Sequence, residues 1–352
     1  MNRIGQHGVF RGEQHCLVVL CLTVAVAVLL DATTSSSIRA QSQSTSESTD
    51  AILFHRPPRT GDVWNGPQHR QIHGNVSRFD AEVLTVATED GQVRNLASDQ
   101  VDRVVPRWAN EQAAHARRLV QQRQFRAAIP ALEQAVRSGI PRWQQRLLIA
   151  DLVRSVASIG KTRSAGTLFL NLAASHPPPA LYADMPLCWT TQEPDVTLRD
   201  AARQWLASDD PHAQLLGASW LLSGASRGEA EAGLRRLESS SVEIVAQLAR
   251  WQRRRLTPPP ESLERMPTWM AERDALLGPL QLGPTEFMAE RLAQTGQIEL
   301  AVGQWMRIVT QHQDRYHRWQ AAVEQVESAL QRLGNPEQAE RFQAWIDQAP
   351  QF

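Results

Sequence analysis

The chain has 352 residues, of which 42% are hydrophobic and 21% charged, so it is long enough for two domains and apolar enough to bury a core. Its 37 basic and 37 acidic side chains balance to a formal net charge of zero. No global field therefore favours nucleic acid, an anionic membrane surface or an acidic substrate, and we predict no nucleic-acid partner.

The first 40 residues have the organisation of a secretory signal peptide. Arg3 and Arg11 precede an apolar run at 16–30, which is too short for a comfortable membrane span. We place the cleavage after Ala40, so that residues 1–40 are removed and the mature chain keeps no stable membrane span. The protein is then periplasmic, or secreted from a bacterium. An uncleaved membrane anchor is the alternative.

Residues 41–59 are assigned to a disordered tether, because the stretch from 33 to 49 is dominated by Ser, Thr and Gln and has almost nothing to bury. Loss of the signal peptide leaves Cys188 as the only cysteine, so the mature chain can form no internal disulfide. We predict that this thiol is buried and unreactive, since no histidine lies near it in the sequence.

Strand-like patterns begin at about residue 60 and continue to 106. Apolar and polar residues alternate, Asp90-Gly91 is typical of a tight hairpin, and Gly74 indicates a bulge or a bend in the first strand. The expected strands are 71–79, 82–88, 91–97 and 101–105, and the expected inward residues include Val76, Leu84, Val86 and Val104. Residues 60–106 therefore form a small β module that leans on the rest of the chain.

The bent strand with Gly74 and Val76, followed by an apolar strand, an Asp-Gly turn and a closing strand, resembles the small barrels of SH3-like and Sm-like proteins. Many short β-meanders share these features. The resemblance implies that residues 60–106 fold as a small β-barrel or a β-meander. His69 and His73 lie here without any established metal-ligand spacing, so we predict neither a metal nor a cofactor.

Amphipathic helices are predicted for residues 107–350, because apolar residues recur three and four positions apart. Four segments share one register, in which an apolar residue is followed four positions later by glycine, or once by arginine, and five positions further by alanine. The sets are Leu119, Arg123 and Ala128; Val156, Gly160 and Ala165; Leu292, Gly296 and Ala301; and Leu330, Gly334 and Ala339. The glycine would end one helix in a left-handed cap, and the alanine would let the next helix approach closely.

This register resembles the tetratricopeptide repeat, whose second helix carries such an alanine and whose units stack into a solenoid. The alanines within each pair are 37 and 38 residues apart, and Arg123 replaces one glycine, so the repeats are divergent. Between the two pairs, residues 197–256 resemble generic helical hairpins of the HEAT type. We therefore predict a mainly α fold, an α-α hairpin repeat solenoid preceded by the small β module.

The chain contains no sequence motif of an established enzyme class. A phosphate-binding glycine loop, a serine nucleophile elbow and a zinc-binding helix are all missing, so we predict that the protein is not an enzyme. Eleven tryptophans are present. Most of those on predicted helices fall on apolar stripes and are expected to pack in the core, whereas Trp64 lies in a loop-like sequence.

The architecture predicts an exported, non-enzymatic scaffold that binds an unknown protein or peptide of the cell envelope, because solenoids present a long rigid surface. The alternative is a cell-envelope glycan-binding protein or hydrolase that uses the β module and exposed tryptophans. A deep pocket with converging carboxylates or coplanar exposed tryptophans would favour this alternative. A smooth helical groove would favour the scaffold.

The tetratricopeptide resemblance implies that first-helix residues of each unit line a concave groove. Carrying over its register gives Asn110, Arg117 and Gln121 from the first unit, Arg154 from the second, Glu290 and Gln294 from the third, and Glu324 from the fourth. A peptide with an acidic terminus could pair with Arg117 and Arg154. We expect the double change Arg117→Glu and Arg154→Glu to weaken binding at least tenfold and to leave the fold intact.

Overall fold

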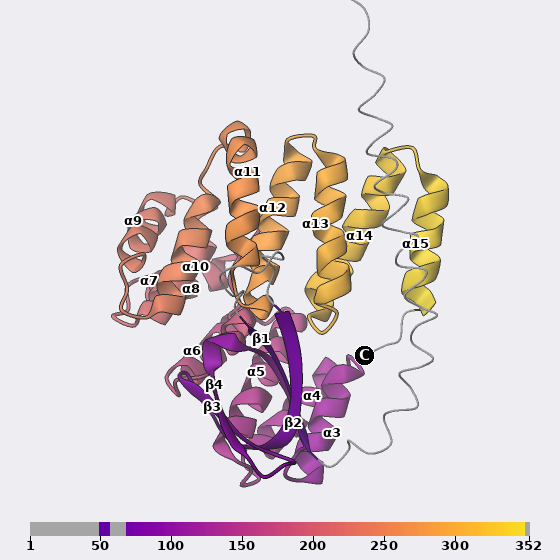
Figure 1. The fold of residues 1–352 in the computed structure, drawn as a ribbon. Coiled ribbons are helices and arrows are strands. Elements are labelled where there is room, and N and C mark those ends of the chain that lie inside the picture. Colours follow the sequence, from indigo (N-terminus) through magenta and orange to yellow (C-terminus); the bar gives the residue numbers. More distant parts are fainter. Residues whose placement is uncertain (1–48, 57–67, 349–352) are drawn as a thin grey trace, which may run out of the picture. The chain divides into compact units, whose positions relative to one another are not determined.

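A five-stranded antiparallel sheet precedes the helices in the computed structural model, which describes residues 49–56 and 68–348 (Figure 1). The expected signal peptide, most of the expected tether and Trp64 lie outside these residues. The strands are β1 (Asp50–Arg56), β2 (Gln68–Phe79), β3 (Val83–Thr88), β4 (Val93–Ala97) and β5 (Val101–Val105). Their order is β4-β3-β2-β1-β5, so a four-stranded meander has β5 added beside β1.

Thirteen α-helices follow within the described residues, joined in part by short 3-10 helices. The α-helices are α3 (Glu111–Gln121), α4 (Phe125–Val136), α5 (Arg142–Ser158), α6 (Thr162–Ala173), α7 (Val196–Leu206), α8 (Pro211–Leu221), α9 (Arg227–Leu237), α10 (Glu243–Arg254), α11 (Pro259–Asp274), α12 (Leu282–Gln294), α13 (Ile298–Gln311), α14 (Tyr316–Arg332) and α15 (Pro336–Gln348). The 3-10 helices are η2 (Ser98–Gln100), η3 (Pro179–Asp184) and η4 (Gly278–Gln281). No described helix is both long and apolar enough to cross a membrane.

Strand β1 corrects the boundary of the tether, which the sequence analysis extends to residue 59. Ile52 of β1 is fully buried and pairs with Ile72 of β2 and with Val104 of β5. The Asp50 carboxylate accepts the backbone N–H groups of Val76 and Arg107. A single strand of this length shows little periodicity of its own. Because it follows a long Ser/Thr-rich tract, its composition led to its assignment to the tether.

The sheet is open, so of the two expected forms the barrel is wrong and the meander is the one present. Strands β4 and β5 are its two edges among the described residues and are not hydrogen-bonded to each other. The face that a barrel would close upon is filled by α5, whose Trp143 is buried in the core of the sheet and whose Leu147 packs against it. The module leans on the helices, as predicted, because a helix replaces the missing wall.

The predicted inward positions of the sheet are confirmed. Val76, Leu84, Val86 and Val104 are all buried. Gly74 is required by a close backbone approach, because a Cβ atom there would lie 2.4 Å from the carbonyl oxygen of Ala87. The expected irregularity of this strand is a shift of register against β3 between Val76 and Arg78.

The four repeated segments fold as predicted, with a left-handed residue after each first helix. The φ angles are 61° at Arg123, 80° at Gly160, 78° at Gly296 and 73° at Gly334. The alanine of each second helix is 0 to 5% exposed. Adjacent helices α3 to α6 and α12 to α15 pack as consecutive hairpins, and α7 to α10 form further hairpins between them.

Replacing Ala128 by Leu should lower the free energy of unfolding by about 1–3 kcal/mol, because the fully buried Cβ sits at a close helix crossing that leaves no space for a larger side chain. Ala127→Leu on the exposed side of α4 is the matched control and should change stability by less than about 0.5 kcal/mol. Urea denaturation measures both. Equal stability of the two variants would contradict the close crossing.

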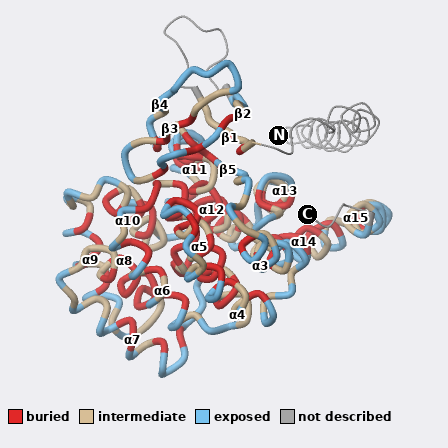
Figure 2. The backbone as a smooth tube through the Cα atoms, turned by 90° about the horizontal axis from the view of Figure 1, so that it is seen from below, coloured by how far each residue is buried: buried red, intermediate tan, exposed pale blue. Residues whose placement is uncertain are grey.

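Arg123, which replaces a glycine, links the first hairpin to the last described pair of helices. Its guanidinium lies 4.0 Å from the ring centroid of Tyr316 and 5.1 Å from that of Trp319, both on α14. Phe125 of α4 also packs on Tyr316, with ring centroids 6.2 Å apart. The turn between α3 and α4 therefore meets α14, so the helical array turns back on its own first hairpin (Figure 2).

Candidate functional site

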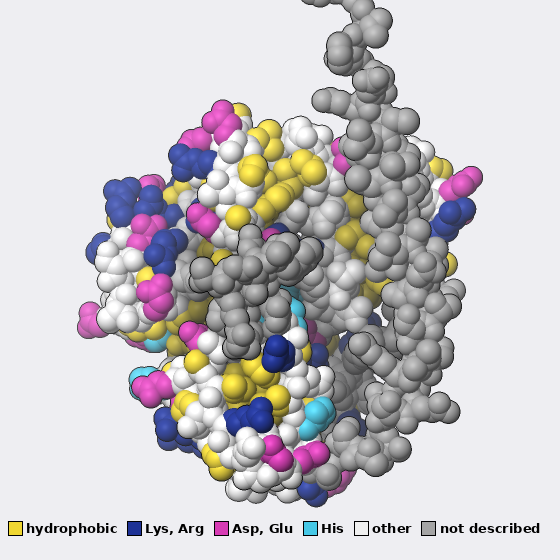
Figure 3. Space-filling model, viewed as in Figure 1, with side chains coloured by type: hydrophobic (Ala, Val, Ile, Leu, Met, Phe, Trp, Pro, Cys, Tyr) yellow, Lys and Arg dark blue, Asp and Glu magenta, His cyan; other side chains and the backbone are white. Residues whose placement is uncertain are grey.

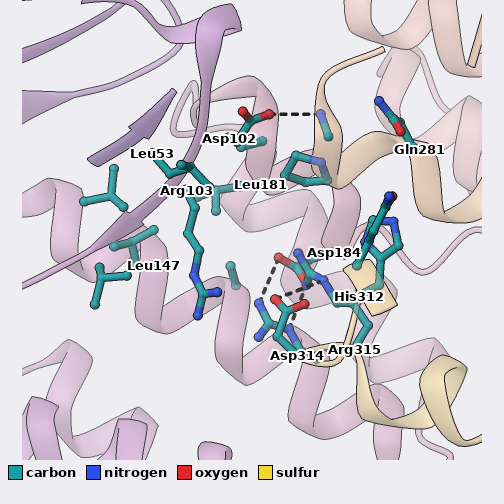
Figure 4. A pocket seen from close by; sticks show the side chains of 18 of the residues that line it. Leu53, Asp102, Arg103, Leu147, Leu181, Asp184, Gln281, His312, Asp314 and Arg315 are labelled. Atoms are coloured by element: carbon teal, nitrogen blue, oxygen red, sulfur yellow. Dashed lines mark hydrogen bonds and ion pairs between the residues drawn. The ribbon is translucent and has the colours of Figure 1, made fainter. Parts of the chain in front are cut away.

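A cleft of about 1240 Å³ opens where the sheet meets the helices. Its walls come from β1, β2, β5, α3, α5, η3, the segment from α11 to η4, and the segment from α13 to the turn before α14. Figure 4 shows part of this lining. Leu53, Val104, Leu147 and Leu181 make part of it apolar. Charged side chains gather at two places in this lining, which we name the floor and the latch.

The floor consists of Arg117, Asp151, Arg154, Asp184 and Arg315. Arg154 donates from Nε to Asp184 Oδ1 at 3.0 Å, and its Nη1 lies 3.2 Å from Asp151 Oδ1. Arg117 pairs with Asp151, and Arg315 pairs with Asp184. The two aspartate side chains are only 4% and 1% exposed. Three guanidinium groups thus share two deeply buried carboxylates.

Four separate elements supply the floor. Arg117 comes from the middle of α3, and Asp151 and Arg154 lie three residues apart on α5, so they share one helix face. Asp184 ends η3, and Arg315 immediately precedes α14. Burial, together with the like charges of Arg154 and Arg117, lowers the pKa of Arg315 well below its ordinary value. The floor is therefore a polar contact among distant parts of the chain.

The latch consists of His55, His69 and Asp102. The two imidazoles lie opposite each other on β1 and β2, and each Nδ1 is 3.4 Å from Asp102 Oδ2. Asp102 Oδ1 accepts the backbone N–H of Gly278 in η4 at 3.0 Å. Hydrogen bonding to Asp102 raises the pKa of His55 above its ordinary value. The latch joins the sheet to η4, and no group of described residues is arranged to hold a metal ion.

The residues predicted for one groove are divided among several places. Arg117, Gln121 and Arg154 line the cleft. Asn110 instead caps α3, accepting the N–H of Ala113 at 2.9 Å and donating to Ser138 Oγ at 2.8 Å. Glu324 is exposed on α14 and lines no described cavity.

Glu290 and Gln294 line a second cavity of about 430 Å³ that shares no lining residue with the cleft. Arg255 organises it by donating to the carbonyl oxygens of Cys188 and Ser219, each at 2.8 Å. Glu290 accepts from Thr191 Oγ1 at 3.2 Å, and burial raises the pKa of its carboxyl. Cys188 is buried, as predicted. A single groove, basic at one end and acidic at the other, is therefore not formed.

The floor also corrects the expected outcome of the double change Arg117→Glu and Arg154→Glu. Both arginines already bind buried carboxylates, so the change would place two new negative charges beside Asp151 and Asp184. Like charges at this distance in a buried site are strongly destabilising. The fold would not stay intact, and these two residues are unsuitable for a test of binding alone.

Three further residues of the cleft were missed by the sequence analysis. Arg103 reaches from β5 into the cleft (Figure 4) and makes no hydrogen bond or ion pair with any described residue. His312 and Arg315 come from the turn between two helices, where no periodic register applies. The one sequence signal that could have pointed to the floor is Asp184, which is a lone acidic residue within a long apolar, Pro-rich stretch.

Basic and acidic side chains are interspersed over α9 and α10 in Figure 3, so this region presents no patch of a single sign of charge. No family model, curated protein or solved structure matches the chain. The cleft is therefore the feature from which a function has to be argued.

Proposed function

We propose that this protein is an exported, non-enzymatic scaffold that binds a peptide, or an extended segment of a cell-envelope protein, in the cleft. The observation that carries the proposal is the cleft itself, which joins apolar walls to a few polar groups at the meeting point of the sheet and the helices. Its volume of about 1240 Å³ suits a segment of several residues better than a small metabolite.

The edge of the sheet supports an extended ligand. Strand β5 is an edge strand of the described sheet, and its residues Arg103, Val104 and Val105 line the cleft. Val105 is 51% exposed, although it is apolar. A peptide that added a strand here would use backbone hydrogen bonds for affinity and the apolar walls for selectivity. The helical hairpins, which we regard as divergent tetratricopeptide repeats with HEAT-like units between them, hold these walls in place.

The alternative, a cell-envelope hydrolase or glycan-binding protein, has one feature in its favour, since five aspartates line the cleft. Asp151, Asp184, Asp274 and Asp314 are each paired with arginines, however, and Asp102 is engaged by the latch. A hydrolase needs carboxylates that are free to reach the substrate. No tryptophan among the described residues is fully exposed, and Trp108 is the one that lines the cleft, so no pair of coplanar exposed tryptophans is available to sugars there.

Retention of random octapeptides by the immobilised protein, analysed by mass spectrometry, tests the proposal. We expect the protein to retain peptides and Ala114→Trp, which fills the cleft from α3, to retain at least tenfold less. His115→Trp is the matched control, because this neighbouring exposed residue does not line the cleft. Failure to retain peptides, or equal retention by Ala114→Trp, would contradict the proposal. Retention of a cell-wall oligosaccharide panel instead would favour the alternative.

A further inference from the structure

The floor of the cleft has more positive than negative charge. Arg117, Arg154 and Arg315 surround the buried carboxylates of Asp151 and Asp184. A third acid, Asp314, lies farther away, at 3.7 Å from Arg315 Nε, and its side chain is 37% exposed, so water screens it. A buried cation without a matching anion is costly, which favours a ligand that brings one negative charge.

Two other groups in the cleft have no partner among the described residues. Arg103 extends into it from β5 and makes no ion pair (Figure 4). His312 ends α13, is only 7% exposed, and its Nε2 atom makes no hydrogen bond although it is buried. Buried polar atoms in folded proteins are almost always hydrogen-bonded. The buried Nε2 atom of His312 therefore lacks its expected partner, and it can donate in its Nε2–H tautomer. Arg103 is exposed and adds a second donor, with a free positive charge, to the same cavity, so the two groups together point to a missing acceptor.

The side chains of the cleft walls limit the chemical class of that acceptor. Leu53, Leu147 and Leu181 lie in the same cleft, so the ligand is apolar next to its charged group (Figure 4). A carboxylate brings one charge, and its planar geometry suits guanidinium groups.

We infer that the cleft recognises the free C-terminal carboxylate of a peptide with apolar last residues. Arg103, His312 and Arg315 receive the carboxylate, and the leucines of the walls contact the preceding side chains. This inference rests on the proposed function, because it names the part of the peptide that the cleft selects. Arg117 and Arg154 position Arg315 through the two aspartates and keep their own ion pairs.

The inference is tested on the full chain with two octapeptide libraries of identical sequences. One library ends in a carboxylate and the other in a carboxamide. We expect at least tenfold tighter retention of the carboxylate library. Arg103→Gln should reduce this preference to less than threefold at an unchanged melting temperature, because Arg103 has no partner to lose. Arg94→Gln, an exposed arginine of β4 outside the cleft, is the matched control and should keep the preference.

The outcomes separate this inference from the proposal on which it rests. Equal retention of the two libraries would overturn carboxylate recognition and leave peptide binding standing. Retention of neither library would remove peptide binding altogether. A carboxylate preference that persists unchanged in Arg103→Gln and also in Arg315→Gln, checked for folding by circular dichroism, would overturn the assignment to these residues.

Discussion

Replacing Asp184 by Asn should lower the free energy of unfolding by about 3–5 kcal/mol, the range for breaking one partner of a buried ion pair. Asp184 is 1% exposed and pairs with both Arg154 and Arg315. A neutral amide would leave these two guanidinium groups close together, buried and without their shared counter-charge. Urea denaturation at pH 7 measures the effect.

Asp314→Asn is the matched control for this change. Its carboxylate is 37% exposed and lies 3.7 Å from the same Arg315, so its loss should cost less than about 1 kcal/mol. If the two variants were equally stable, the floor would not be the buried contact described above. Because Asp184 joins η3 to α5 and to the start of α14, its loss should also loosen the cleft and reduce peptide retention.

Acidification from pH 7 to pH 4 should lower the free energy of unfolding of the original protein by about 3 kcal/mol more than that of the His312→Gln variant. Burial lowers the pKa of His312 from its ordinary 6.5 to about 4 in the folded state. Between these values the unfolded chain binds a proton that the folded chain excludes, so stability falls as the pH falls through 6.5. The loss levels off below about pH 4, where both states are protonated.

His55 should contribute a pH dependence of stability with the opposite sign, and the His55→Gln variant tests it. Its pKa is raised by Asp102, so His55 contributes stability that is fully present below 6.5 and is lost as the pH rises through the raised value. Urea denaturation at several pH values from 4 to 8 separates the two histidines. If the unfolding free energies of the original protein and His312→Gln ran parallel across this range, His312 would not be buried and neutral.

Local features of the fold were predictable because they depend on neighbouring residues. The register of the four repeats placed Ala128, Ala165, Ala301 and Ala339 at close helix crossings, and all four are buried. Alternation placed Leu84 and Val86 on the inner face of the sheet. Both periods are set by the backbone geometry of helices and strands, so a sequence reveals them without knowledge of the fold. The expected end of the tether was wrong, and of the two forms expected for the β module only the meander is present, since strand β1 and the wall provided by Trp143 depend on contacts from elsewhere.

The candidate site was predictable only in part. Arg117, Gln121 and Arg154 were found because they face the same way on successive first helices, but their register could not reveal that Asp151 and Asp184 already bind the two arginines. The contact of Arg123 with Tyr316 shows where the helical array turns back on its first hairpin. This turn brings Arg315 and His312 into the cleft, almost 200 residues along the chain from Arg117. The sequence by itself determined the hairpins and the sheet. The cleft and its charges were decided by tertiary structure, because contacts such as that of Arg123 with Tyr316 join segments far apart in the chain, and no local pattern specifies them.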